Sequence, residues 1–358
     1  MTQFFETQKG VNTKPSIFMR HDFLDLAKGV GILLVIAGHT IQEGSAKFDD
    51  SLLFRIIYSF HMPLFVFLSG AVASLWYDPN TIDEGIRRTW IAFKARMSKV
   101  AVRLLLPFLA WTVINSIFFK GFNSVFPDLI LAFRRPDSSL WFLLCIFYCV
   151  FLFCLFQLVY AAIYALLNQF GLLSDRFIKI IKSGQWQLIS IFLLWLFLKH
   201  YSSHAAGLGL LKIYFNYFVL GIWFYKCIYP IQLKWSRLPL FLIFALCVSF
   251  WHRSSLDHIL PNSYLFFQEP FIRYIFSAFV AICGILIAID ITDEIFKRKP
   301  RLIYPFLIIC GKLSLGIYVI HHYFLNISPP IVTALLLSIL ISWLILKIPI
   351  AKTVLLGE

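Results

Sequence analysis

The sequence predicts an all-α integral membrane protein with about ten transmembrane helices and both termini in the cytoplasm. Hydrophobic residues make up 60% of its 358 residues and charged residues only 14%, against roughly 45–50% and 25% in ordinary globular domains. So few charges cannot cover a water-soluble surface. The apolar runs are long, whereas a membrane β-barrel would show alternating segments of about ten residues.

The individual spans follow from length, because a membrane-spanning helix needs about 20 mostly apolar residues. The first apolar run follows a polar leader without a small-residue cleavage site, so we interpret it as a retained span rather than a signal peptide. No repeat or soluble linker interrupts the chain, and residues 1–358 are predicted to form one membrane domain. The ten predicted spans are 24–43, 52–76, 104–120, 140–167, 187–201, 210–229, 238–252, 270–291, 304–327 and 329–350.

The orientation follows from the loop charges. With the N-terminus inside, the inner segments and span ends hold 22 lysines and arginines and the outer ones hold nine. Basic residues accumulate on the cytoplasmic side, which predicts a multi-pass protein of the inner (plasma) membrane. The net charge of +14 is then explained by the lipid bilayer, and no nucleic-acid partner is expected.

Residues 82–103 differ from the other loops. Basic residues alternate there with apolar ones, as in an amphipathic helix lying on the inner leaflet. One interpretation is a membrane anchor only, since polybasic segments beside spans are common. The other is a docking surface for a phosphorylated cytosolic ligand, because guanidinium groups match phosphate geometry. The basic residues assigned to this surface are Arg87, Arg88, Arg96 and Arg103.

Ionisable groups inside the first span are functional candidates, because they are costly at membrane depth. Lys28 and His39 are eleven residues apart, so they share a helix face about 16 Å apart along the axis. Asp25 lies within about 60° of Lys28 around the same helix. The alternatives are that Lys28 is an anchor at the span end and that His39 only packs against another helix.

Two further spans carry histidines. His61 lies two residues before Pro63 in the second span, where a proline kinks a helix. In the ninth span, Ser314, Tyr318 and His321 share one face, and His322 is expected to point elsewhere. The alternative for each is helix–helix hydrogen bonding. No zinc-binding spacing connects the histidines, and the seven cysteines lie in apolar runs without CxxC, so neither a metal nor a disulfide is predicted.

A buried imidazole can act as a general base near neutral pH or carry an acyl group. Both chemistries suit acyl transfer to a hydroxyl. The residues do not specify more than this by themselves.

Five sequence motifs, taken together in their order along the chain, resemble those of one known family. They are LDLAKGVGILLVIAGH, FHMPLFVFLSG, RLLLP at Arg103–Pro107, LWFL at Leu140–Leu143, and GKLSLGIYVIHH. They resemble the acyltransferase 3 family of membrane O-acyltransferases, and within it the fucose 4-O-acetylase-like group. The resemblance implies a cytosolic acyl-CoA donor, usually acetyl-CoA, and a carbohydrate acceptor. It also implies a basic residue eleven positions before the first-span histidine, which here gives Lys28 and His39.

We therefore expect an O-acetyltransferase that moves an acetyl group from acetyl-CoA to a hydroxyl of a cell-surface or envelope carbohydrate, either free or lipid-linked. His39 is the expected catalytic base or transient acyl carrier, and His61, Tyr318 and His321 position the acceptor or stabilise charge. Ser314, Glu269 and Arg273 are expected to contact the acceptor, although the last two could instead form a local ion pair. Donor binding is assigned to Lys28, Arg87, Arg88, Arg96 and Arg103. The alternative function is a transporter or flippase for a lipid-linked or small polar substrate.

Overall fold

The computed structural model of the chain describes residues 17–134, 140–171, 174–198, 208–228, 237–253 and 270–358. Within these ranges every regular element is a helix, as the sequence predicts. The first half contains α1 (Ile17–Gly44), η1 (Phe48–Asp50), α2 (Leu52–Ala73), η2 (Pro79–Glu84), α3 (Gly85–Val100), the π-helical η3 (Ala101–Leu105), α4 (Leu106–Lys120), η4 (Phe122–Ser124), α5 (Val125–Arg134) and α6 (Trp141–Gln169).

The second half begins with shorter helices and ends with a broken one. Its elements are α7 (Asp175–Lys182), α8 (Gly184–Leu198), α9 (Leu208–Trp223), the π-helical η6 (Phe224–Ile228), α10 (Arg237–Ser249), α11 (Pro270–Arg298), α12 (Ile303–Lys312), α13 (Ser314–Ile320), the 3₁₀-helical η9 (His321–Phe324), α14 (Pro330–Leu346) and α15 (Pro349–Leu356).

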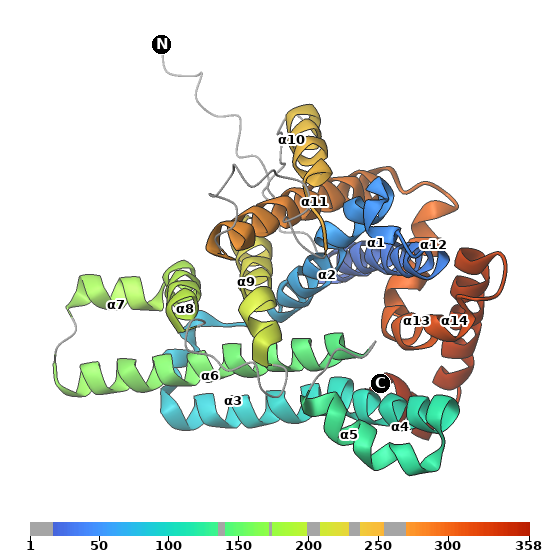
Figure 1. Cartoon of the computed structure of the whole chain (residues 1–358). Helices are drawn as coiled ribbons and strands as arrows, with labels where there is room; N and C mark the ends of the chain where they lie inside the picture. The colour runs from blue at the N-terminus through green and yellow to red at the C-terminus, as the bar shows by residue number, and fades with distance from the viewer. Residues whose placement is uncertain (1–16, 135–139, 172–173, 199–207, 229–236, 254–269) are drawn as a thin grey trace.

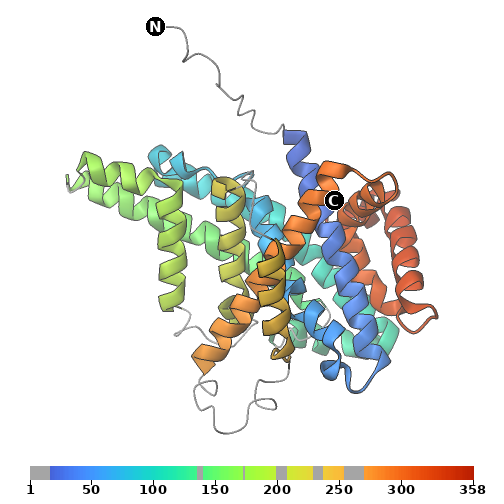
Figure 2. The same cartoon turned by 90° about the horizontal axis from the view of Figure 1, so that it is seen from above.

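The blue helices α1 and α2 lie at the centre of the molecule. The green helices α6 to α8 extend to one side of them, and the red helices α12 to α14 cover the other (Figure 1, Figure 2). The most extensive contacts join α1 to α12 and α2 to α9. Fifteen residues of α2 are buried, including Pro63 in the helix interior. Any internal site therefore lies against α1 and α2.

Among the described residues, five helices are long and apolar enough to cross a membrane: 22–44, 52–73, 85–120, 141–169 and 272–298. Residues 303–312 and 314–324 add a sixth if they count as one span, bent by 70° at its centre. Helices at 184–197, 237–249 and 330–346 are apolar but shorter. Each of the ten predicted spans thus contains a helix. A multi-pass membrane protein is confirmed, and the count of ten stays a prediction.

Two helix crossings depend on glycine. A Cβ at Gly70 of α2 would lie 1.9 Å from the carbonyl oxygen of Phe218 in α9, and one at Gly311 of α12 would lie 1.7 Å from the carbonyl oxygen of Asp25 in α1. No side chain fits at those distances. Small residues let membrane helices approach backbone to backbone, and here they hold α1 and α2 against their main partners.

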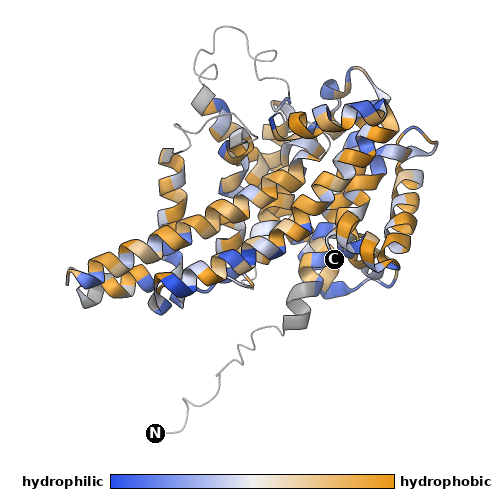
Figure 3. Cartoon of the chain, turned by 90° about the horizontal axis from the view of Figure 1, so that it is seen from below, coloured by the Kyte–Doolittle hydropathy of each residue, from blue (hydrophilic) through white to orange (hydrophobic). Residues whose placement is uncertain are grey.

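Apolar residues predominate along most of the helices (Figure 3). Large side chains such as Phe118, Phe122 and Ile350 are more than two-thirds exposed, which would be unfavourable in water and is expected in lipid. The seven cysteines are all free, and each is buried or half-buried. Such burial is typical of cysteines that act as small packing residues.

The basic segment is connected to the next span more closely than predicted. Helix α3 continues through η3 into α4, so that 85–120 is one long helix rather than a surface helix followed by a span. A π-helical turn adds a residue to the repeat and changes which side chains face inward. Phe93, Met97 and Val100 pack against the protein core, while Arg87, Arg88 and Trp90 are exposed. The predicted amphipathic character is therefore present.

Candidate functional site

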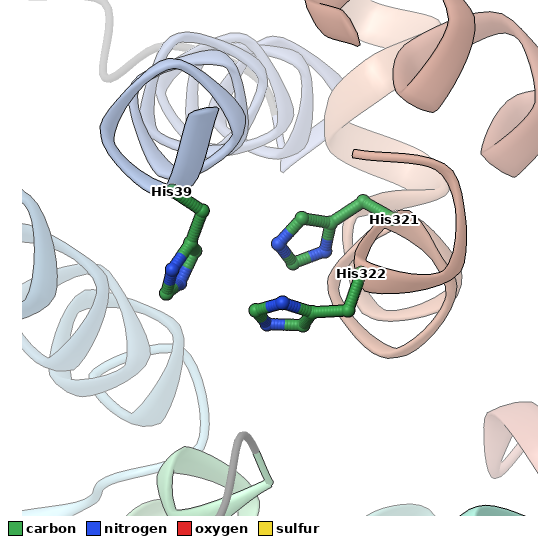
Figure 4. A group of neighbouring side chains, drawn as sticks. All are labelled: His39, His321 and His322. Carbon is green, nitrogen blue, oxygen red and sulfur yellow. The ribbon is translucent and has the colours of Figure 1, made fainter. Parts of the chain in front are cut away.

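Three histidines meet at one end of the central helices. His39 comes from α1, and His321 and His322 come from η9, nearly 300 positions later in the chain (Figure 4). The ring centroid of His39 is 5.3 Å from that of His321 and 4.5 Å from that of His322. One ring nitrogen from each residue lies within 4.8 Å of those of the other two. We call these residues the histidine cluster.

The position of His322 corrects the sequence analysis, which expected it to point away from His321. The two rings are 4.1 Å apart and both face His39. The α-helical periodicity used for the prediction ends at Ile320, because α13 gives way there to the 3₁₀ turn η9. A 3₁₀ turn has three residues per turn, so the helical-face argument does not extend to residue 322.

Hydrogen bonds fix the tautomer of His39. The Tyr58 hydroxyl donates to Oε1 of Gln42 at 2.5 Å. Its oxygen therefore accepts from Nδ1–H of His39, 3.3 Å away. This leaves the lone pair of His39 on Nε2. Tyr58 thus orients His39 in the way that hydrogen-bond partners orient catalytic and metal-binding imidazoles.

Backbone carbonyls fix two more imidazoles in the same tautomer. Nδ1–H of His321 donates to the Ile317 carbonyl at 2.9 Å, and Nδ1–H of His61 donates to the Ile57 carbonyl at 3.0 Å. Both rings are almost completely buried. The Nε2 atoms of His321 and His322 have no hydrogen-bond partner among the described residues. Buried polar atoms are seldom left unpaired, so the histidine cluster is prepared for an external group.

A cavity of about 320 Å³ leads toward this region from the side on which Lys28 lies. Its lining comes from α1, α2, α3, η3, α6 and α13. One end carries four cations, and the interior is mainly apolar, with the hydroxyls of Ser69, Ser314 and Tyr318. The cations are Lys28, Arg96, Lys99 and Arg103, and we call them the basic mouth.

The inner end of the cavity comes within about one helical turn of the histidines. Three residues that line the cavity are close in sequence to a histidine. Val35 comes four residues before His39, and Met62 comes directly after His61. Tyr318 comes three residues before His321. The Tyr318 ring is 6.4 Å from the His321 ring. The predicted grouping of Ser314, Tyr318 and His321 on one side of the ninth span is therefore present, with Tyr318 between the cavity and the histidine cluster.

The structure divides the predicted donor residues into two groups. Lys28, Arg96 and Arg103 line the cavity, whereas Arg87 and Arg88 do not. Arg88 instead pairs with Glu84 at 3.3 Å on the surface. Arg96 lies over the Trp76 ring at 4.0 Å, which holds its guanidinium at the basic mouth.

Lys28 is held by its own helix. Its ammonium group is 3.2 Å from the Asp25 carboxylate, and both side chains are about one-fifth exposed. The sequence analysis correctly placed these two residues on neighbouring positions of α1.

The predicted acceptor residues lie elsewhere or are not described. Glu269 falls outside the described residues, so the predicted pair with Arg273 stays untested. Arg273 is half-buried near the start of α11 and does not line the cavity. Ser314 does line it, together with the donor residues.

Sequence reasoning missed several residues of the site. Lys99 lines the basic mouth, and Trp76 and Ser69 line the cavity. Lys99 lies three residues after Arg96 on the same helix, and this spacing could have found it. Tyr58 and His322 had no such signal, because their roles depend on how α1, α2 and η9 meet in space.

The fold and the site define a multi-pass helical membrane protein with three histidines gathered beside an internal cavity. The chain belongs to the acyltransferase 3 family, because residues 21–354 match the family's acyltransferase domain. It is therefore an acyltransferase, and the family resemblance drawn from the motifs is confirmed.

Two relatives are similar to part of the chain. Nodulation protein NolL of Sinorhizobium fredii (strain NBRC 101917 / NGR234) is 35% identical over 127 residues, which is 33% of this chain and 32% of the relative. Nodulation protein NolL of Mesorhizobium japonicum (strain LMG 29417 / CECT 9101 / MAFF 303099) is 37% identical over 91 residues, or 24% and 21% of the two chains. The chain thus matches a third or less of the length of either relative. No solved structure matches it.

Proposed function

We propose that this membrane acyltransferase moves an acetyl group from acetyl-CoA to a hydroxyl of a cell-surface or envelope carbohydrate. The observation that carries the proposal is the cavity that leads from four cations at its mouth to within one helical turn of the histidine cluster. A donor that is anionic at one end and reactive at the other fits such a cavity.

The donor assignment rests on charge and size. Coenzyme A carries its phosphates on the nucleotide and its thioester at the end of an uncharged pantetheine arm. Arg96, Lys99 and Arg103 suit the phosphates, and the largely apolar interior suits the arm. About 320 Å³ is near the lower limit of ligand pockets, roughly 300–1,000 Å³. We therefore assign the arm to the cavity and the nucleotide to the outside of the basic mouth.

His39 serves as general base in this proposal. Its Nε2 takes the proton of the acceptor hydroxyl while the hydroxyl oxygen bonds to the thioester carbonyl carbon. The tetrahedral intermediate then breaks its C–S bond, and the proton on Nε2 passes to the thiolate, giving free coenzyme A and an acetyl ester. Tyr58 holds the tautomer that this requires. His61, Tyr318 and His321 position the acceptor or stabilise the oxyanion.

The acceptor assignment rests on the resemblance to the fucose 4-O-acetylase-like group and on the position of His39 far along α1 from the basic mouth. Lys28 and His39 are eleven residues apart, about 16 Å along the helix. Ser314 lines the cavity beside Lys28 and Arg103, so its predicted acceptor contact would be made on the donor side. We assign the remaining acceptor contacts to Arg273 and Glu269. A lipid-linked sugar could approach that end of α1 from within the bilayer.

The proposed topology has ten spans, cytoplasmic termini and insertion in the inner (plasma) membrane. It is supported by the charge bias of 22 to nine. It is also supported by the packing of the last helix. A Cβ at Gly357 would lie 2.4 Å from the carbonyl oxygen of Arg103, so the C-terminus and the basic mouth lie on the same face of the protein.

The test uses the full chain reconstituted in lipid with acetyl-labelled acetyl-CoA and envelope carbohydrate from a strain lacking the protein. We expect release of free thiol together with alkali-labile label in the carbohydrate, and neither with His39→Gln. A transporter would instead move the carbohydrate or its lipid-linked form across the bilayer without thiol release, which would contradict the proposal. If acetyl label remained on denatured wild-type protein, His39 would be an acyl carrier rather than a general base.

A further inference from the structure

The histidine cluster has a property that acyl transfer does not need. Transfer requires one basic nitrogen, yet three imidazoles from two helices converge with ring nitrogens within 4.8 Å of one another (Figure 4). We propose that His39, His321 and His322 bind a divalent transition metal ion of the zinc type, and that the bound ion stops acyl transfer. The second half of this proposal rests on the proposed function, and the first half does not.

The ligand atoms carry the first argument. A hydrogen bond to Tyr58 holds His39 in the tautomer whose Nε2 carries the lone pair, and a hydrogen bond to the Ile317 carbonyl does the same for His321. A hydrogen bond from the opposite nitrogen is the usual support of a metal-binding histidine, because it fixes the ring and raises its basicity. Imidazole nitrogen is the ligand type that zinc and its neighbours prefer.

The unpaired atoms carry the second argument. Nε2 of His321 and Nε2 of His322 are buried without a partner among the described residues, and the His321 side chain is 0% exposed. Leaving a buried polar atom unpaired costs about 1–3 kcal/mol. A metal ion would pair with both Nε2 atoms at once. A hydrogen bond between the two rings would pair them only if one ring turned an N–H toward the nitrogen of the other.

The distances need a modest adjustment. Zinc–nitrogen bonds of about 2.0–2.1 Å in a tetrahedral site place the nitrogens roughly 3.3 Å apart. The three nitrogens would therefore have to close by up to about 1.5 Å, which rotation of the side chains can provide. Three protein ligands leave a fourth position for water.

The surrounding charge sets the affinity. No carboxylate belongs to the cluster, and the Arg253 guanidinium lies over the Tyr58 ring at 5.2 Å. Arg253 is exposed, so water screens its repulsion of a cation. We therefore expect reversible binding of added ions rather than a permanently occupied structural site.

Inhibition follows from the lone pair. A metal ion on Nε2 of His39 occupies the same electron pair that would take the acceptor proton. Metal binding and base catalysis then exclude each other at this residue, so filling the site should lower transfer by about 10²–10⁴-fold, the usual cost of losing a general base.

The binding experiment uses the full chain purified with a tag that contains no histidine, treated with a chelator and exchanged into metal-free buffer. Zn²⁺ is titrated against a metal indicator, and Co²⁺ is followed by its visible absorption. We expect one ion per chain and a tetrahedral Co²⁺ spectrum. His322→Ala and His321→Gln should each weaken binding on the order of 10- to 100-fold. His252→Ala, a matched histidine outside the cluster, should bind like the wild type.

Wild-type protein without a tetrahedral Co²⁺ spectrum, or cluster variants that bind as tightly as His252→Ala, would overturn the site. Transfer is then measured with and without Zn²⁺, each variant being compared with its own metal-free rate. Zinc should inhibit the wild type, a chelator should restore it, and His322→Ala should be less sensitive. Stimulation by zinc would overturn the inhibitory half. If no transfer is found at all, the proposed function fails, and the binding titration still decides the metal site.

Discussion

The basic mouth and the histidine cluster lie at opposite ends of one pathway and are built differently. At the mouth, Lys99 and Arg103 are exposed, and several cations share the task. At the cluster, His321 is buried, and the rings of His39 and His321 each have their own hydrogen-bond partner. Exposed charges attract an anion collectively, and no single one is essential. Buried imidazoles act through position, so we expect replacement of any one of them to have a large effect.

The largest expected effect is at the buried end. His39→Gln keeps much of the side-chain volume and some hydrogen bonding, but its amide cannot accept a proton near neutral pH. We expect kcat for acetyl transfer to fall by about 10²–10⁴ with little change in the KM for acetyl-CoA. Steady-state kinetics of reconstituted protein measure this, with His39→Ala as a companion variant. Near-normal turnover of well-folded His39→Gln would make His39 a packing residue and transfer the role to His61 or His321.

The second effect is at the exposed end. Neutralising Arg96, Lys99 and Arg103 together to glutamine should raise the KM for acetyl-CoA by about 3- to 100-fold, taking roughly 0.2–1 kcal/mol for each exposed pair. The increase should shrink in high salt, which screens charges over about 8–10 Å.

The matched control for the mouth is the double variant Arg87→Gln, Arg88→Gln. It removes two cations from the same helix, but neither lines the cavity. An equal rise in KM for both variants would mean that the whole basic helix attracts the donor and that the mouth has no special part.

A smaller effect is expected at Tyr58, whose hydroxyl hydrogen-bonds His39 and whose ring packs edge-on against the His39 ring. Tyr58→Phe removes one hydrogen bond, worth about 0.5–1.5 kcal/mol, and should lower kcat by about 2- to 12-fold. The KM for acetyl-CoA should not change, because Tyr58 does not line the cavity. A change in KM alone would place Tyr58 in donor binding. Comparing the pH profiles of Tyr58→Phe and the wild type would separate orientation of His39 from loss of packing.

The smallest effect is expected for the Lys28–Asp25 ion pair at the basic mouth, whose two side chains are half-buried. Asp25→Asn removes the partner of Lys28 but leaves the ammonium group at the cavity. A pair of this kind is worth about 0.2–1 kcal/mol, so the KM for acetyl-CoA should change less than about fivefold. A collapse of activity would show that the Asp25 carboxylate is needed to position Lys28. Single residues would then be essential at the basic mouth, as we expect at the histidine cluster.

The membrane class, the positions of the helices and the Lys28–Asp25 pair were all predictable, because each depends on residues close together in the chain. Hydropathy decides where helices form, and helix geometry decides which neighbours meet.

What could not be predicted depends on how distant segments meet. The α-helical repeat separated His322 from His321, and only the 3₁₀ turn η9 brings them together. A spacing motif for metal binding cannot find ligands that α1 and η9 contribute from opposite ends of the chain. Likewise, Arg87 and Arg96 are equally basic in the sequence, and only the packing of α3 decides which of them reaches the cavity.

The phenol of Tyr318, packed against Phe142 on one side and His321 on the other, also concerns the permeability of the membrane. In the proposed function, a cytosolic donor reaches deep into the bilayer and proton-exchanging imidazoles lie beyond it, an arrangement that resembles a proton channel. A continuous file of water between them would dissipate the ion gradient across the membrane. Side chains packed at this point interrupt such a file, so enlarging the passage with Tyr318→Ala should make proteoliposomes leak protons even where it leaves the donor bound.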